Sequence, residues 1–203
     1  MLSGEQEAGC AFAGARLGVG TDEPIMVVDI GGASTELVSG GPGGPEAAVS
    51  LQLGAVRQTD EHLASDPPTA REIAALRAGA IALVAPALAA IGGPRRAVGV
   101  AGTITTLAAI ELGVYDPERV HGHALGRGTV DRLARDLAAM TVERRREVPG
   151  LDPARAGVIV AGAIIASVVL AAAGRDEITV SEKDLLDGVV LALADPSNDL
   201  FRS

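Results

Sequence analysis

The sequence predicts an α/β fold with a mixed sheet of about five strands flanked by helices. Short runs rich in β-branched residues, at 25–30, 97–101 and 177–180, are typical of buried strands. Two further strands, 37–39 and 46–53, continue the first as a meander. Stretches with apolar residues at helical spacing separate and follow these strands, so helices are expected to cover the sheet. They run over 70–91, 104–112 and 129–140.

The composition limits the class of protein and its partners. The chain has 203 residues, 48% hydrophobic and 21% charged, which is enough for one sizeable core. Aromatic residues are 1%, so Val, Leu, Ile and Ala must build the core and no platform for stacking bases is expected. The net charge of −9 argues against nucleic acid and anionic membranes as partners. With Cys10 alone and no signal-peptide pattern, we expect a reducing, cytoplasmic location.

One apolar stretch is nearly long enough to cross a membrane. No charged residue occurs over 156–174, between Arg155 and Arg175. The stretch is mostly Ala and Gly with Val and Ile, and aromatic anchors do not flank it. We therefore expect a buried core helix here and no membrane partner.

The segment 25–38 carries the strongest signal for chemistry. A buried strand ends at Asp29, and a glycine turn follows it, in which the absence of a Cβ lets backbone approach a ligand. Hydroxyls and a second acid, Glu36, come next. Amides and hydroxyls suit phosphoryl oxygens, and carboxylates suit Mg²⁺ or water. The same residues also fit an ordinary β-hairpin with a polar turn. The phosphate-binding candidates are Gly31, Gly32, Ala33, Ser34 and Thr35.

This segment resembles a known family. Asp29-Ile-Gly-Gly-Ala-Ser-Thr-Glu36 is similar to the second phosphate-binding loop, D-I-G-G-G-S-T-E, of the exopolyphosphatase and guanosine pentaphosphate phosphohydrolase (Ppx/GppA) family. The third loop glycine is replaced by Ala33. Counterparts to other family motifs follow in order: Leu2–Ala8, Leu53–Arg57, Gly99–Ile104, Val120–His123, Leu151–Pro153 and Val180–Ser181 with Gly188.

The resemblance implies a fold, a reaction and roles. The fold is ribonuclease H-like, of the actin and sugar kinase type. The activity is release of terminal orthophosphate from polyphosphate or guanosine pentaphosphate, with Mg²⁺ or Mn²⁺ as cofactor. Asp29 and Glu36 are then the metal-binding and catalytic acids. Glu7 corresponds to the glutamate that activates the attacking water, although a glutamate at a helix start is also explained by the helix dipole.

Other residues are candidate substrate contacts. Gly99, Gly102 and Thr103 lie where a strand passes into a helix, and a helix N-terminus can bind an anion. A tight strand-to-helix turn explains them equally well. Arg57 is either a phosphate ligand or a surface salt-bridge partner.

Two clusters further along the chain have more than one interpretation. His121 and His123 could bind a metal from one strand face, but no third ligand is near in sequence and Mg²⁺ prefers oxygen. The triplet 144–146, three arginines, is either a solvated face or a cationic surface for a polyanion.

Five residues lead to specific structural predictions. Thr69 should cap the helix 70–91, and Pro86 should kink or split it. Asp152 as N-cap and Pro153 as first helical residue should start the apolar helix. Gly188 in the last helix should let another backbone approach.

The resemblance also suggests a domain organisation. Residues 1–20 are expected to be a hinge helix from the end of a first domain, 21–195 the second domain, and 196–203 a tail. Nothing here matches the first domain, which points to a truncated homologue or a misplaced start codon. The alternatives are then a non-catalytic domain that binds polyphosphate or nucleotide, or an inactive remnant. The nucleotide half of a sugar or acetate kinase is less well supported. Since the family often dimerises, a homodimer is also expected.

Overall fold

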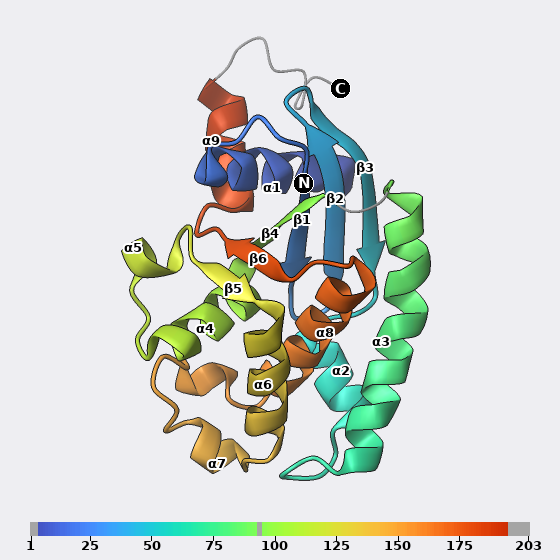
Figure 1. Ribbon diagram of the computed structural model, residues 1–203, viewed down its shortest axis with the longest axis vertical. Coiled ribbons are helices and arrows are strands. Elements are labelled where there is room, and N and C mark those ends of the chain that lie inside the picture. The colour runs from blue at the N-terminus through green and yellow to red at the C-terminus, as the bar shows by residue number, and fades with distance from the viewer. Residues whose placement is uncertain (1–3, 93–94, 195–203) are drawn as a thin grey trace.

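A mixed sheet forms the centre of the protein (Figure 1). The structure is a computed structural model that describes residues 4–92 and 95–194, apart from the side chains of Glu5 and Glu7. The predicted tail, 196–203, lies outside these residues. Within them the sheet has six strands in the order β3-β2-β1-β4-β6-β5. The strands are β1 (Ile25–Ile30), β2 (Thr35–Gly41), β3 (Gly44–Leu51), β4 (Arg96–Val100), β5 (Ala124–Gly126) and β6 (Glu177–Val180).

The sheet combines an antiparallel and a parallel half. Strands β1, β2 and β3 form an antiparallel meander, as predicted. On its other edge β1 pairs in parallel with β4, and β4 pairs in parallel with β6. The short strand β5 adds to β6 in antiparallel orientation. The α/β class and the mixed sheet are confirmed, with β5 bringing the predicted five or so strands to six.

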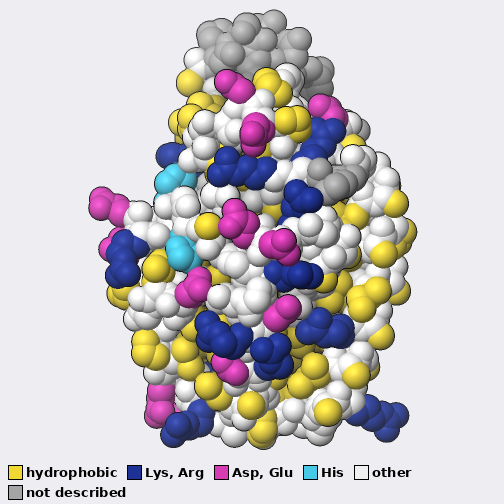
Figure 2. Space-filling view, in the orientation of Figure 1, with side chains coloured by type: hydrophobic (Ala, Val, Ile, Leu, Met, Phe, Trp, Pro, Cys, Tyr) yellow, Lys and Arg dark blue, Asp and Glu magenta, His cyan; other side chains and the backbone are white. Residues whose placement is uncertain are grey.

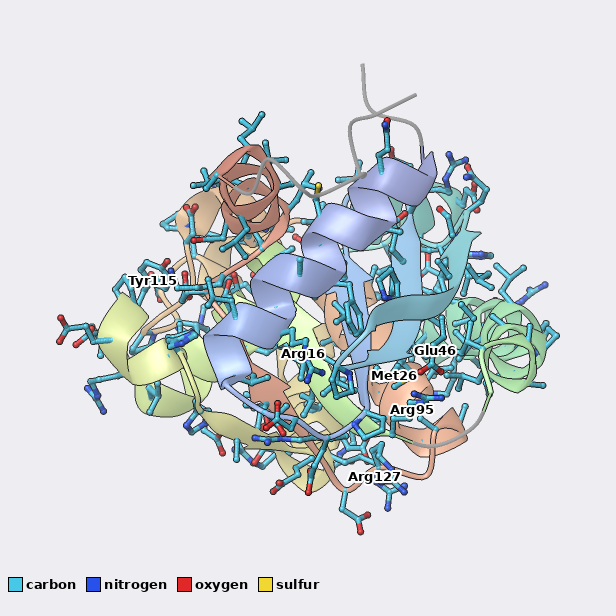
Figure 3. The ribbon with its side chains drawn as sticks, turned by 90° about the horizontal axis from the view of Figure 1, so that it is seen from above. Arg16, Met26, Glu46, Arg95, Tyr115 and Arg127 are labelled. Atoms are coloured by element: carbon cyan, nitrogen blue, oxygen red, sulfur yellow. The ribbon has the colours of Figure 1, made fainter. Side chains whose placement is uncertain are left out.

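Helices cover both faces of the sheet. Alternate residues of β1 point to opposite sides: Ile25 and Val27 pack with Phe12 of α1, whereas Met26 and Val28 join the larger core on the opposite face. Viewed from above, α1 crosses one face of the sheet with α9 beside it (Figure 3). The helices are α1 (Gly4–Val19), α2 (Ala55–His62), α3 (Ala70–Ala90), α4 (Ala101–Leu112), α5 (Pro117–Val120), α6 (Arg127–Ala138), α7 (Val142–Arg145), α8 (Ile159–Ala172) and α9 (Leu185–Ala194).

The helix termini follow their sequence signals with two exceptions. Thr69 caps α3 in a capping box with Glu72, as predicted. Pro86 does not split α3, which runs as one helix from Ala70 to Ala90. Asp152 accepts a hydrogen bond from the Ala154 amide, but this cap starts only a 3₁₀ turn, Pro153–Arg155. The apolar helix α8 begins later, at Ile159, and its residues 159–170 are buried, which confirms a core helix.

Helix α3 is long and apolar. Its 21 residues are long and apolar enough to cross a membrane by length and composition alone. In this fold α3 instead packs along α8, α2 and β3 (Figure 1).

Helices α1 and α9 touch through glycines. A Cβ on Gly188 would lie 1.8 Å from the carbonyl oxygen of Cys10, and one on Gly14 would lie 1.9 Å from the carbonyl oxygen of Asp184. No side chain fits at such distances. The prediction that Gly188 permits a close backbone approach is therefore confirmed, and the approaching backbone belongs to α1.

Replacing Gly188 with Ala should destabilise the protein by about 1–3 kcal/mol, because the methyl group must push α9 away from α1. Urea unfolding followed by circular dichroism measures this change. Gly128→Ala is the matched control, since a Cβ at that exposed helical position has nothing within 4 Å. Equal stability of the two variants would contradict the close approach.

Candidate active site

Two strand-to-turn connections meet at one edge of the sheet. Because β1 and β4 are parallel neighbours, with Asp29 opposite Val100, the turns that follow them lie side by side. They enclose a hollow of about 200 Å³. Its lining combines the glycine turn after β1, the start of α4, the start of α2 and the turn before α8: Ile30, Gly31, Gly32, Ala55, Val56, Ala101, Gly102, Thr103, Arg155, Val158 and Ile159.

The glycine turn after β1 is fixed by backbone hydrogen bonds. The Gly31 amide donates to the Ser34 carbonyl at 3.0 Å, which closes the turn. The carbonyls of Gly31 and Gly32 accept from the amides of Ala55 and Val56, each at 2.9 Å. Helix α2 therefore holds the turn from outside, and the turn has a fixed shape before any ligand binds.

Gly54 makes this contact possible. A Cβ on Gly54 would lie 2.3 Å from the Gly32 carbonyl oxygen and 2.4 Å from the Ala33 carbonyl carbon. Its backbone is extended, with φ −113° and ψ 159°, which any residue adopts. Space alone therefore requires glycine, because a side chain would displace the turn.

The opposite wall is the start of α4. Ala101 has φ +62°, a left-handed conformation that is rare for a residue with a side chain, and it turns the chain directly from β4 into the helix. The first amides of a helix have no partner within it and attract anions. The Thr103 hydroxyl donates to the Ile30 carbonyl at 2.8 Å and ties the two turns together.

Arg155 supplies a positive charge that the sequence analysis did not single out. Its guanidinium lies against Gly102, where a Cβ would come within 2.1 Å of Nη2. Within the described residues its side chain forms no ion pair and no hydrogen bond. Arg155 also borders a second hollow, of about 510 Å³, which Thr105, Thr106 and Tyr115 help to line. Sequence spacing gives no sign that this arginine faces Gly102 across the fold.

Asp29 and Glu36 form the acidic part of the site. They are direct partners in the antiparallel register of β1 and β2, so their side chains share one face of the sheet. The Ser50 hydroxyl donates to Glu36 Oε1 at 2.8 Å. Partial burial, with Glu36 and Asp184 nearby, raises the pKa of Asp29 to about 6. A cation would relieve this penalty.

This pair fits a hard divalent cation. Within residues 4–92 and 95–194, no group of three or more His, Cys, Asp and Glu side chains converges as a metal site. Mg²⁺ is commonly bound by one or two carboxylates together with water and substrate phosphate oxygens. Asp29, near the end of the strand that leads into the glycine turn, and its register partner Glu36 supply two such carboxylates.

Three residues that were predicted to contact substrate make structural contacts in this fold. The Thr35 side chain is fully buried and its hydroxyl donates to the Leu53 carbonyl, so it anchors the turn and does not face the hollow. Gly99 lies inside β4, where a Cβ would meet Ile104 and Ile178, and it does not line the hollow. Arg57 donates to the Ala33 carbonyl at 3.0 Å and to Gln52 at 2.9 Å, so it braces the turn from its outer side.

The remaining candidates are spread over the molecule. Ser34 is half-buried and Ala33 exposed, both in the turn after β1. Glu7 lies in α1, and its side chain is outside the described part of the structure. His123 contacts Glu111 at 2.8 Å, whereas His121 accepts from the Glu182 amide, so the two rings have different partners.

The arginine triplet does not form one cationic surface. Arg144 and Arg146 are exposed, but Arg145 is 2% exposed and hydrogen bonded inside the protein. The prediction that the triplet is a single solvated or polyanion-binding face is therefore wrong for Arg145. More widely, Figure 2 shows acidic and basic side chains mixed across one face of the molecule. At a net charge of −9, attraction of an anion depends on local groups such as Arg155.

Comparisons with known proteins agree with this geometry. The model of the Ppx/GppA phosphatase family matches residues 1–196. A protein named exopolyphosphatase 2 from Mycobacterium tuberculosis is 37% identical over 203 residues, an alignment that covers 96% of this chain and 63% of that protein. One named exopolyphosphatase 1 from Mycobacterium leprae is 33% identical, over 98% of this chain and 60% of that protein. The chain thus spans about 60% of the length of these curated relatives.

Solved structures show the same fold. The crystal structure of the Aquifex aeolicus member of the Ppx/GppA family superimposes with a TM-score of 0.88 and 31% identity, covering 95% of this chain and 63% of that one. An exopolyphosphatase-like protein superimposes with a TM-score of 0.87 and 36% identity, over 95% and 67% of the two chains.

Gly54→Ala should weaken binding of inorganic tripolyphosphate about tenfold or more, because the methyl group displaces the turn that forms one wall of the hollow. Isothermal titration calorimetry measures the affinity. Gly126→Ala, where a Cβ meets nothing within 4 Å, should bind like the wild type. Undiminished binding by Gly54→Ala would show that the anion binds elsewhere.

Asp29→Asn should stabilise the metal-free protein, and more so at pH 7.5 than at pH 4. Since the folded-state pKa is about 6 and the ordinary value is 3.8, the folded protein loses stability as the pH rises from about 4 to about 6. Asp29→Asn has no carboxyl group to ionise at this position. Its stability advantage over the wild type should therefore grow by roughly 1–3 kcal/mol across that pH window.

Urea unfolding at both pH values, in the presence of a chelator, measures the effect. Asp60→Asn, at an exposed position of α2, serves as the control and should show no such change. An equal advantage of Asp29→Asn at both pH values would contradict the raised pKa.

Proposed function

Since the chain belongs to the Ppx/GppA phosphatase family, we propose that it hydrolyses the terminal phosphoanhydride bond of polyphosphate or of guanosine pentaphosphate and releases orthophosphate. The observation that supports this most directly is the hollow between two strand-end turns. It brings together backbone amides and the Arg155 guanidinium. The strand that leads into its glycine turn carries Asp29, the register partner of Glu36. The names of the relatives, exopolyphosphatase 1 and 2, favour polyphosphate.

The hollow suits a terminal phosphoryl group in size and charge. The volume of about 200 Å³ accommodates a phosphoryl group with bound water and excludes a folded polymer. In the proposal, the amides of Gly32 and Gly102 donate to its oxygens, and Arg155 balances its negative charge. Such donors stabilise charge most when they are fixed before the reaction, as the hydrogen bonds to α2 fix this turn.

Proton transfer completes the proposed reaction. The oxygen of a water molecule bonds to the terminal phosphorus, the bond from phosphorus to the bridging oxygen breaks, and the shortened chain leaves with its electron pair. Glu7 accepts the proton from the attacking water. Helix α1, which carries Glu7, lies on the same sheet face as Asp29 and Glu36, as the packing of Ile25 and Val27 on α1 requires.

A divalent cation belongs to this proposal. Asp29 and Glu36 would hold Mg²⁺ or Mn²⁺, with Ser50 orienting Glu36. When bound, the ion neutralises phosphate charge and positions the reacting oxygens. The proposal also includes a cytoplasmic location and pairing of two chains.

The purified chain should release orthophosphate from long-chain polyphosphate in Mg²⁺ and stop when a chelator is added. Glu7→Gln should reduce the rate at least a hundredfold, as expected for loss of a general base, while leaving binding intact. A malachite green assay for orthophosphate measures the rate. Asp60→Asn is the control for a surface acid. Release that persists in Glu7→Gln would reject this residue as the base, and binding without release would leave a phosphate-binding domain.

A further inference from the structure

A buried arginine lies directly behind the loop that carries Arg155. The Arg145 side chain is 2% exposed. Its guanidinium donates to the Ala156 carbonyl at 2.7 Å and to the Met140 carbonyl at 3.1 and 3.2 Å. It also pairs with the Asp66 carboxylate at 3.3 Å. Burying a charge is costly unless it is paired and hydrogen bonded, and each of the three guanidinium nitrogens has a partner.

The network joins three separate segments. Asp66 belongs to the loop between α2 and α3, and its carboxylate also accepts from the Val142 amide at 2.9 and 3.0 Å. Met140 belongs to the connection between α6 and α7, and Val142 is the first residue of α7. Ala156 directly follows Arg155. The planar guanidinium therefore fixes all three segments relative to one another.

Two of these segments continue into walls of the hollow. The loop that contains Asp66 follows α2, whose first residues Ala55 and Val56 line the hollow and hold the glycine turn. The segment after Ala156 supplies Val158 and Ile159 to the lining of the hollow. Arg145 is thus bonded to two segments that adjoin the lining, without lining the hollow itself.

We propose that Arg145 is a positioning residue for Arg155: by holding the Ala156 carbonyl, it fixes the place from which the Arg155 guanidinium reaches across Gly102 into the phosphate hollow. Arg155 is exposed, and its side chain forms no ion pair or hydrogen bond among the described residues, so the position of its charge depends on how the backbone beside it is held. The proposal rests on the proposed function, in which Arg155 contacts a phosphoryl group.

The hydrogen-bonding geometry of the guanidinium explains why residue 145 is an arginine. Three donors of one rigid plane reach two carbonyls and a carboxylate in different directions. Lysine offers one ammonium group, which can approach the Asp66 carboxylate but cannot also bond to both carbonyls. Lysine at this position should therefore preserve the ion pair with Asp66 and lose the hydrogen bond to the Ala156 carbonyl.

A double-mutant cycle separates positioning from general stability. Arg145→Lys and Arg155→Gln should each weaken tripolyphosphate binding about tenfold, and the double variant should bind no more weakly than Arg155→Gln alone. Arg144→Met, at the exposed neighbouring position, should bind like the wild type. Affinities come from isothermal titration calorimetry, on variants whose circular dichroism matches the wild type. Additive losses, or an unchanged affinity of Arg145→Lys, would overturn the proposal.

A second measurement needs no ligand. In the free protein, ¹⁵N relaxation of the Arg155 Nε–H group should show greater side-chain motion in Arg145→Lys than in the wild type or in Arg144→Met. Equal motion in all three would overturn the proposal. If the wild-type chain fails to bind tripolyphosphate, the proposed function fails for this chain, and the relaxation result still decides whether Arg145 restrains Arg155. If Arg145→Lys does not fold, Arg145→Gln replaces it in both measurements, because a single amide group likewise cannot bond to both carbonyls.

Discussion

The parallel pairing of β1 with β4 is the constraint on which the site depends. Parallel neighbours end at the same edge of a sheet, so the glycine turn after Asp29 and the helix start after Val100 must meet there. Antiparallel pairing on the other side of β1 brings Glu36 next to Asp29. One strand with two kinds of neighbour therefore places phosphate donors and carboxylates at a single edge.

Backbone packed against backbone keeps these parts in place. Gly54 allows α2 to touch the glycine turn, Gly102 leaves room for the Arg155 guanidinium, and Gly188 lets α9 touch α1. Each contact excludes even one methyl group. In a chain with 1% aromatic residues, large rings do not set the spacing between layers, and close contacts between small residues do so instead.

Local signals in the sequence were sufficient for much of the fold. The β-branched run of β1, the Thr69 cap and the apolar run of α8 each reflect interactions within a few residues, and each was predicted correctly in kind. Other features of the site depend on neighbours that are distant in the sequence. Thr35 and Gly99 have the right chemistry for a ligand, but Leu53, Ile104 and Ile178 occupy their surroundings. Arg155 was overlooked and Arg145 was assigned to the surface, because only tertiary packing distinguishes one arginine of this chain from another.

The division of the sheet also has a consequence for how the chain acquires its structure. The meander of β1, β2 and β3 joins residues close in sequence, whereas β4 and β6 pair across the intervening helices α4 to α8. Contacts between distant residues carry a larger loop-closure entropy and form more slowly. We therefore expect the acidic pair to assemble early, with the nascent hairpin, and the guanidinium of Arg155 to arrive only when the last parallel strand docks. Anion affinity would then be a better measure of complete folding than the content of secondary structure.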